Sequence, residues 1–244
     1  MASIWRLFTS LNTCIALLLA LCAVMGGSSF LLTGDKAGSI NAMPLVRWLV
    51  DAPFSWSWWL WVTLVLLVLL VLNTVACSCD SVWLRWRSSG IVTIIAPQLM
   101  HAGFLTIVLA HGISAVAGEH RQIDVAEGMV VQLPDGNRIG IGTIAADLSP
   151  TGIPVGHTCQ LWTDPGRSGS RVTISPNHPW FSGGYGVYIS AAETVPLRRA
   201  RIEIRREPGA GAALAGAALF LAGNLAVLLQ RSRRCDIKDV EFST

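Results

Sequence analysis

Four stretches of the sequence are apolar and long enough to cross a lipid bilayer, and this feature limits the fold more than any other. A membrane-spanning helix needs about 20 predominantly apolar residues, because the hydrocarbon core is about 30 Å thick. The four stretches that meet this requirement are Asn12–Leu32, Trp58–Cys77, Ile91–Ala117 and Gly209–Gln230. The sequence therefore predicts a membrane protein with four transmembrane α-helices.

The composition excludes several other classes of protein. Of the 244 residues, 52% are hydrophobic and only 14% are charged. This balance argues against a free-standing soluble enzyme and against intrinsic disorder. The formal net charge is only +3, and the basic residues form no patch interleaved with aromatic residues, so we expect no nucleic-acid partner.

A polar segment, residues 119–207, separates the third and fourth apolar stretches and has the pattern of β structure. The turn sequence Pro134-Asp135-Gly136-Asn137 predicts a hairpin between Gly128–Leu133 and Arg138–Ile144. Alternation of apolar and polar residues predicts three more strands, at Arg171–Ser175, Tyr185–Ala191 and Arg199–Arg205. We expect five or six short strands in a small sheet or sandwich.

These patterns predict three parts of the chain. Residues 1–118 form an N-terminal membrane part with three transmembrane helices, and residues 119–207 form a small extracytoplasmic β domain inserted between helices 3 and 4. Residues 208–244 form the fourth helix and a cytoplasmic tail.

The positions of the arginines predict the orientation in the membrane. Arg6 precedes the first apolar stretch, Arg85 and Arg87 lie between the second and third, and Arg231 follows the fourth. By the positive-inside rule we expect both termini in the cytoplasm and residues 119–207 on the outer side of the membrane, which for a bacterial inner membrane is the periplasm. A cleaved signal peptide is disfavoured, because the first apolar run continues through Leu32.

The six cysteines do not predict a disulfide or a metal site. In the expected topology only Cys159 faces the periplasm, so it lacks an intramolecular partner there. Cys77 and Cys79 have the wrong spacing for a redox Cys-x-x-Cys motif, and two thiols alone make a poor zinc site. We interpret the cysteines as small buried apolar residues.

Two histidines in the third apolar stretch are the candidate functional residues. Counted from Ile91 at about 1.5 Å per residue, His101 lies about 15 Å into the bilayer and His111 about 30 Å along, near the outer surface. An ionisable group in the middle of a membrane is costly, which makes His101 the stronger candidate. A neutral imidazole there suits haem iron, and Ala102 and Gly103 beside it predict room for a porphyrin face.

The chain cannot coordinate one haem with both histidines. Ten residues of helix separate them by about 15 Å of rise and about 80° of rotation, and the other three spans contain no histidine. A second axial ligand would have to come from a methionine or from another subunit. Small residues around the fourth span, including Ala212, Gly216 and Gly223, fit contact with a second subunit and packing within this chain equally well.

Four tryptophans, Trp56, Trp58, Trp59 and Trp61, crowd the start of the second span. They predict an interfacial belt, with stacking on an exposed haem edge as the alternative.

Five segments carry a resemblance to a known family. They are Leu72–Asp80 at the end of the second span, Met100–Leu105 in the third, Gly112 to Glu119 at its exit, Asn177–Tyr188 in the polar segment, and Arg206–Gly209 before the last span. In these motifs and in its layout, the chain resembles a short variant of the ResB family of cytochrome c assembly proteins. That family works in the system II pathway with a ResC/CcsA haem-handling partner.

The resemblance implies a role in haem transport during cytochrome c biogenesis. It implies that His101 supplies one axial ligand to a haem b and that a CcsA/ResC-like protein supplies the other, after which the haem is attached to apocytochrome c. His111, near the outer surface, has a weaker claim to a ligand role because of its position. The chain shows no catalytic set of its own, so the resemblance makes it at most a subunit of a haem-attachment complex in the lipid membrane. Arg201 and Arg205 would either contact haem propionates or form a solvated strand face.

Two other functions remain open from the sequence. One is a haem-b electron-transfer membrane subunit of a redox complex. The other is a non-haem membrane scaffold whose β domain docks a periplasmic partner.

Overall fold

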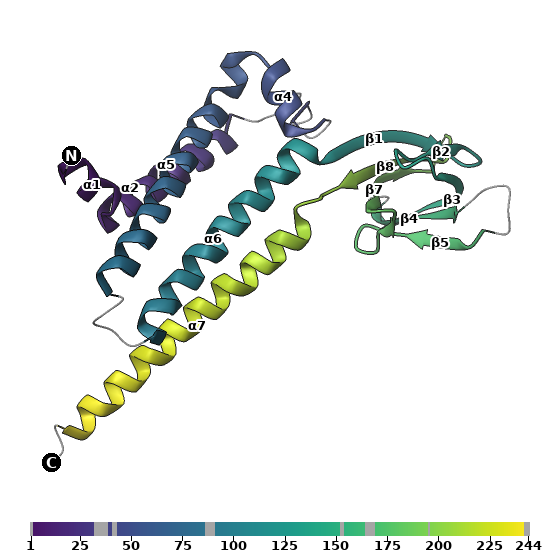
Figure 1. Cartoon of the computed structure of the whole chain (residues 1–244). Helices are drawn as coiled ribbons and strands as arrows, with labels where there is room; N and C mark the ends of the chain where they lie inside the picture. The colour runs from purple at the N-terminus through teal and green to yellow at the C-terminus, as the bar shows by residue number, and fades with distance from the viewer. Residues whose placement is uncertain are drawn as a thin grey trace. The chain divides into compact units, whose positions relative to one another are not determined.

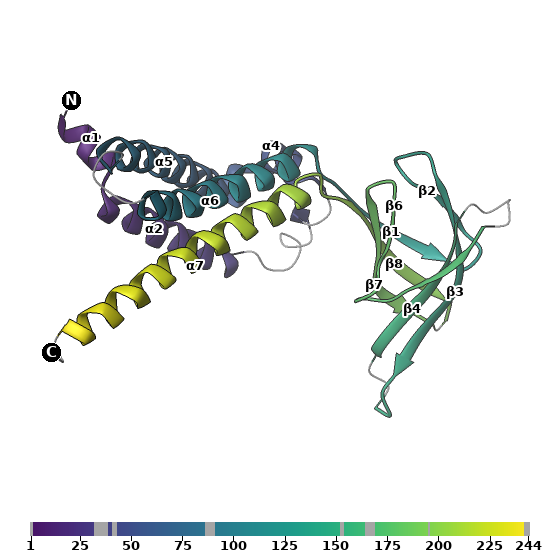
Figure 2. The ribbon, with the colours of Figure 1, turned by 60° about the horizontal axis from the view of Figure 1, so that its bottom comes forward.

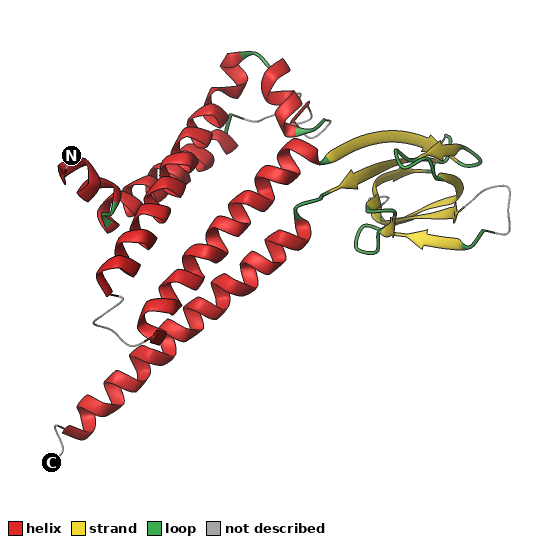
Figure 3. Cartoon of the chain, viewed as in Figure 1, coloured by secondary structure: helices red, strands yellow, loops and turns green. Residues whose placement is uncertain are grey.

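The computed structural model describes residues 2–31, 39–40, 43–85, 91–151, 154–163, 169–194 and 196–241. Leu32 and Arg87, which entered the predictions of span and orientation, lie outside these ranges. The chain forms two compact units. The first comprises Met1–Ala37, Trp48–Ser114 and Gly209–Thr244, and the second comprises Gly38–Arg47 and Ala115–Pro208. Figure 3 shows that the strands all belong to the segment between the last two helices.

The described helices agree with the predicted spans. They are α1 (Ala2–Phe8), α2 (Leu11–Ser29), α4 (Leu45–Asp51), α5 (Phe54–Arg85), α6 (Ile91–Ala117) and α7 (Ala210–Glu241), shown in Figure 1. Of these, α2, α5, α6 and α7 are long and apolar enough to cross a membrane. This confirms the prediction of four membrane helices. Both α5 and α7 continue past the predicted ends of their apolar runs, because polar residues that leave the hydrocarbon can still extend a helix.

Glycines bring α6 and α7 into close contact. Gly209, Gly216 and Gly223 recur at every seventh residue, the repeat that keeps one face of a helix against its neighbour. A Cβ on Gly216 would lie 2.9 Å from the Gly103 carbonyl oxygen, and one on Gly223 would lie 2.6 Å from Cγ of Met100. Small residues on this face of α7 therefore serve packing within the chain.

The second unit contains two four-stranded antiparallel sheets. One sheet has the order β1-β8-β7-β6 and the other the order β2-β3-β4-β5. Figure 2 shows β3 and β4 side by side as two long strands. The strands are β1 (Glu119–Ala126), β2 (Val130–Gln132), β3 (Arg138–Leu148), β4 (Pro154–Thr163), β5 (Arg171–Ile174), β6 (Trp180–Ser182), β7 (Tyr185–Glu193) and β8 (Arg199–Arg206).

One hydrophobic core joins the two sheets. Ile202 and Ile204 of β8 contribute from one sheet, and Ile139 and Leu161 of the other sheet pack in the same cluster. All four side chains are at most 1% exposed. Two sheets that share one core form a β-sandwich. The alternation predicted for β8 is confirmed, since its buried core residues alternate with side chains that are exposed (Arg199 and Arg201) or half-buried (Glu203 and Arg205).

The predicted hairpin is also confirmed. Gly136 has a φ of 89°, and the Leu133 amide closes the turn by donating a hydrogen bond to the Asn137 carbonyl at 2.8 Å. The structure adds two long strands, β1 and β4, to those expected from the sequence. Strand β1 is polar on its outward face, and β4 begins with Pro154 and contains Gly156, so neither has the apolar density that marks a strand in sequence.

Candidate functional site

His101 lies in α6 and forms a hydrogen bond with Ser78 of α5. The distance from Nδ1 of His101 to Oγ of Ser78 is 2.8 Å. His101 lies about 15 Å of helix rise from the start of α6, and Ser78 about 10 Å from the end of α5. The two helices therefore place the imidazole level with the end of α5 that carries Ser78 and Asp80.

The hydrogen bond engages Nδ1 of His101, and the direction of the bond determines whether Nε2 carries a proton or a free lone pair. When Nδ1 carries the proton and donates to the Ser78 hydroxyl, the lone pair of Nε2 is free to bind a metal. Histidine ligands to metals characteristically donate their other ring N–H to a nearby acceptor, which fixes the tautomer and the orientation of the ring. The pair therefore has the arrangement that an axial ligand requires.

Gln98 is a second polar side chain of α6 close to His101. Gln98 precedes His101 by three residues, a spacing that puts both on one side of the helix. Its Nε2 atom is buried and has no hydrogen-bond partner among the described residues. An unpaired amide in a membrane helix is costly, so Gln98 offers a donor to any polar group that binds beside His101.

Gly103 does not provide the porphyrin space expected from the sequence. A Cβ at this position would lie 2.6 Å from the Gly216 carbonyl oxygen, so the missing side chain is used to admit α7. That expectation was wrong for Gly103, because helix packing in lipid also selects glycine. Ala102, by contrast, lies on an exposed face of α6.

His111 occupies a different environment at the far end of α6. Its side chain is exposed, and Nδ1 lies 2.8 Å from the Ile107 carbonyl oxygen of the preceding turn. A carbonyl only accepts, so Nδ1 carries the proton and donates. Because α6 is one helix through both histidines, the structure does not bring His111 to His101, and they would serve separate ligands.

Asn73, in the Leu72–Asp80 segment at the end of α5, has a structural role. Asn73 is 1% exposed, and its Nδ2 donates to the Phe8 carbonyl at 2.6 Å. This bond holds α5 against the turn between α1 and α2.

The tryptophan cluster at the start of α5 has one buried member. Trp59 is 7% exposed, and its Nε1 donates to the Trp56 carbonyl at 2.8 Å, whereas Trp58 and Trp61 face outward.

The strand arginines Arg201 and Arg205 are engaged in ion pairs. Nε of Arg201 lies 2.9 Å from Asp124 Oδ1, and Nη2 of Arg205 lies 2.6 Å from Glu203 Oε2. The hydrogen bond from Arg201 lowers the pKa of Asp124. These contacts describe a solvated strand face. Among the described residues, no three His, Cys, Asp or Glu side chains gather closely enough to share a metal ion.

Sequence reasoning missed Ser78 and Gln98. Gln98 carried a signal, since it is a polar residue three positions before the candidate ligand in an apolar run. Ser78 carried only its place in the Leu72–Asp80 motif, because only the packing of α5 against α6 shows that it reaches His101.

The chain has distant similarity to a solved structure. Its sequence matches no protein-family profile and no curated protein. A solved structure described as "Cytochrome c Heme Lyase CcmF" aligns over 90% of this chain and 35% of that one, with a TM-score of 0.42 and 17% identity. The chain thus spans about a third of that protein's length.

Proposed function

We propose that this chain is a haem-handling membrane subunit of cytochrome c maturation that works with a CcsA- or ResC-like partner. The observation that carries the proposal is the His101–Ser78 hydrogen bond of 2.8 Å between two membrane helices. In the proposal His101 is neutral and donates from Nδ1 to the Ser78 hydroxyl, the tautomer that leaves Nε2 free for an axial bond. The resemblance of the flanking motifs to the ResB family supports the same reading.

Ser78 and Gln98 have different roles around His101 in this proposal. Ser78 accepts from Nδ1 and fixes the ring, while Gln98 supplies a buried amide donor on the same side of α6. Haem, when bound, supplies the iron that His101 coordinates. Since α6 presents no second histidine at that level, a partner subunit supplies the opposite ligand. The chain therefore holds and orients its cargo, and attachment uses the thiols of the apocytochrome.

The first experiment measures haem bound to the purified full-length chain. The chain is expressed with and without a CcsA-like protein, and its haem content is read from the pyridine haemochrome spectrum. We expect His101→Ala to remove most of the haem that the partner complex retains. His111→Ala is the matched control on the same helix, and it should leave the content near the wild-type value.

Three results would redirect the proposal. Haem unaffected by His101→Ala would remove the assignment of this ligand. Haem bound equally well without the partner, and reduced and reoxidised by a quinol, would favour the electron-transfer role. Preparations that contain no haem in any combination would favour the scaffold role. Ser78→Ala adds an independent readout, because loosening the ring should shift the haem absorption maximum or reduction potential even where haem is retained.

A further inference from the structure

The second unit contains a pocket at the start of its first strand. It has a volume of about 280 Å³ and is lined by Met43, Pro44, Arg47, Glu119, His120 and Arg121. These residues come from two segments, one at the beginning of α4 and one at the beginning of β1. A volume of this size accommodates a small polar group rather than a drug-sized molecule.

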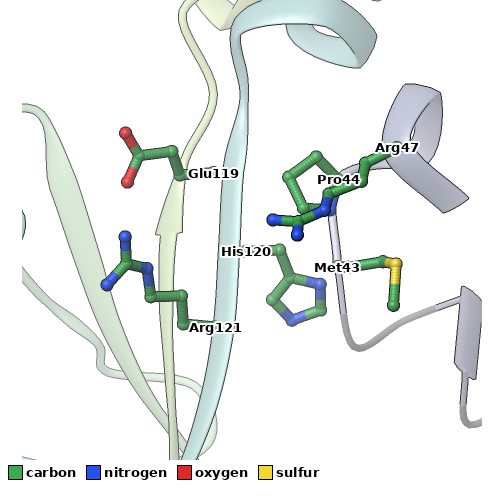
Figure 4. Close-up of a pocket in the computed structure, with 6 residues that line it drawn as sticks. All are labelled: Met43, Pro44, Arg47, Glu119, His120 and Arg121. Carbon is green, nitrogen blue, oxygen red and sulfur yellow. The ribbon is translucent and has the colours of Figure 1, made fainter.

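Side-chain direction separates the lining residues into two groups. Successive residues of a strand point to opposite faces. Figure 4 shows His120 on the same side of β1 as Met43, Pro44 and Arg47, whereas Glu119 and Arg121 extend on the other side. Of the lining residues, His120 of β1 therefore shares its side of the strand with the guanidinium of Arg47 and the apolar side chains of Met43 and Pro44.

One ring nitrogen of His120 is buried without a hydrogen-bond partner among the described residues. This atom, Nε2, lies 3.5 Å from Oε2 of Glu203, too far for a well-formed hydrogen bond. The same Glu203 oxygen is held by Arg205 at 2.6 Å. Burial, reinforced by the charge of Arg205, lowers the pKa of His120.

The pocket lies close to the end of a membrane helix. Helix α6 ends at Ala117, and β1 begins at Glu119. An extended residue spans at most about 3.6 Å, so His120 lies within about 11 Å of the end of α6 along the chain. Each head-group layer of a bilayer is roughly 5 to 8 Å thick. The chain length alone therefore keeps His120 at or beside the depth of lipid head groups.

We propose that this pocket binds the phosphate of a membrane phospholipid head group. Arg47 and His120 provide N–H donors, and a phosphate offers only acceptors at physiological pH, a combination that arginine geometry suits well. Met43 and Pro44 provide apolar walls for the carbons beside the phosphate. The bilayer supplies phosphate at this depth continuously, which favours a lipid over a dissolved anion.

The test uses the full-length protein in detergent, with lipid retention measured by native mass spectrometry. The probes are phosphatidylethanolamine, phosphatidylglycerol and the phosphate-free lipid diacylglycerol. Loss of one charge-assisted contact should weaken phospholipid retention about tenfold in Arg47→Gln. His120→Ala should have a similar effect. Arg138→Gln, the same substitution at an exposed position on β3, should retain phospholipid as the wild type does.

A second variant distinguishes a lost phosphate contact from misfolding of the protein. Arg47→Lys keeps the charge but loses the two-pronged geometry, so it should show intermediate retention while remaining folded by circular dichroism. The proposal is overturned if Arg47→Gln and Arg138→Gln retain phospholipid equally, if diacylglycerol is retained as well as the phospholipids, or if inorganic phosphate at millimolar concentration displaces the lipid. Displacement by haem, lost in the same variants, would instead assign the pocket to a propionate. None of these results depends on the fate of His101.

Discussion

Gly103 of α6 lies directly against the backbone of Phe220 in α7. A Cβ on Gly103 would stand 2.5 Å from the Phe220 amide nitrogen and 2.8 Å from its Cα. Both of these atoms belong to the backbone, which cannot move aside as a flexible side chain can. The contact lies two residues from His101, so the packing of α6 on α7 also determines where the candidate ligand stands.

Replacing Gly103 with valine should separate α6 from α7. Overpacking typically costs about 1 to 3 kcal/mol, and here the obstructing atoms are rigid. We expect a lower thermal unfolding midpoint in detergent and a loss of bound haem. Gly112→Val is the matched control, because a Cβ there meets nothing within 4 Å. Equal behaviour of the two variants would show that the close contact is not maintained in the folded protein.

Asn73 links α5 to the turn between α1 and α2, and its removal should loosen that turn. Its Nδ2 donates to the Phe8 carbonyl at 2.6 Å across 65 residues of sequence. Replacement by leucine leaves the half-buried Phe8 carbonyl with only the weak thiol donor of Cys77, 3.8 Å away, at a cost of about 1 kcal/mol. We expect faster hydrogen exchange at the amides of Ser10 and Leu11 and a lower unfolding midpoint.

Asn224→Leu is the control for this change. The Asn224 amide donates at 2.8 Å to Phe220, within its own helix. Its loss should therefore leave exchange in the α1–α2 turn at the wild-type rate. If exchange in that turn is unaltered in Asn73→Leu, the link between the segments carries no stability.

Much of the fold follows from local patterns that the sequence displays. The span of α6 was predicted to the residue, because its apolar run is bounded on both sides. Strand β8 was predicted from its alternation, and the turn before β3 from Pro134 to Asn137. Strand β1 escaped prediction, since its polar residues are satisfied by pairing with β8: Gln122 donates to Glu203, and Asp124 accepts from Arg201.

The candidate site was predictable only in part. His101 stood out because an ionisable residue in an apolar run is rare. The role of Ser78 depends on which face of α5 meets α6, and serine within a helix ordinarily bonds its own backbone. Gly103 shows the opposite limitation, because a small residue beside a histidine fits cofactor space and helix packing equally well until the neighbouring helix is seen.

Glu127 should make the β domain sensitive to acid. Its Oε1 accepts from the Ile144 amide at 2.8 Å and lies 3.3 Å from Arg198 Nη1. The backbone hydrogen bond, with help from Arg198, lowers the pKa of Glu127 below its usual value of 4.5. A lowered carboxyl pKa stabilises the folded state above the unfolded pKa, and this contribution is lost as the pH falls through the folded value.

The measurement for Glu127 is the unfolding midpoint of the full-length protein followed from pH 7 to pH 3. We expect Glu127→Gln to reduce the loss of stability below a pH of about 4.5, because glutamine keeps an acceptor for Ile144 but does not titrate. Glu193→Gln, at an exposed position, should follow the wild-type curve. Identical slopes for all three proteins would exclude Glu127 as a source of the acid dependence.

Cys159 should resist thiol reagents for as long as the β-sandwich is folded. Its side chain is 0% exposed in the shared core, and burial raises the pKa of its thiol to about 11. At pH 8 only about one molecule in a thousand then carries the reactive thiolate at this position. We expect iodoacetamide to leave the Cys159 peptide unmodified in the native protein and to alkylate it fully in denaturant, as mapped by mass spectrometry. Leu161→Ala, a truncation at a position that is also 0% exposed, should open the core and speed labelling, whereas Leu197→Ala, at a position 58% exposed, should not.

Because the pKa of the Cys159 thiol is higher in the folded than in the unfolded protein, raising the pH from 9 towards 11 should also weaken the fold through this residue, and Cys159→Ala should remove that part of the pH dependence. Rapid labelling of the native wild type at pH 8 would show that Cys159 is accessible and would overturn its assignment to the core.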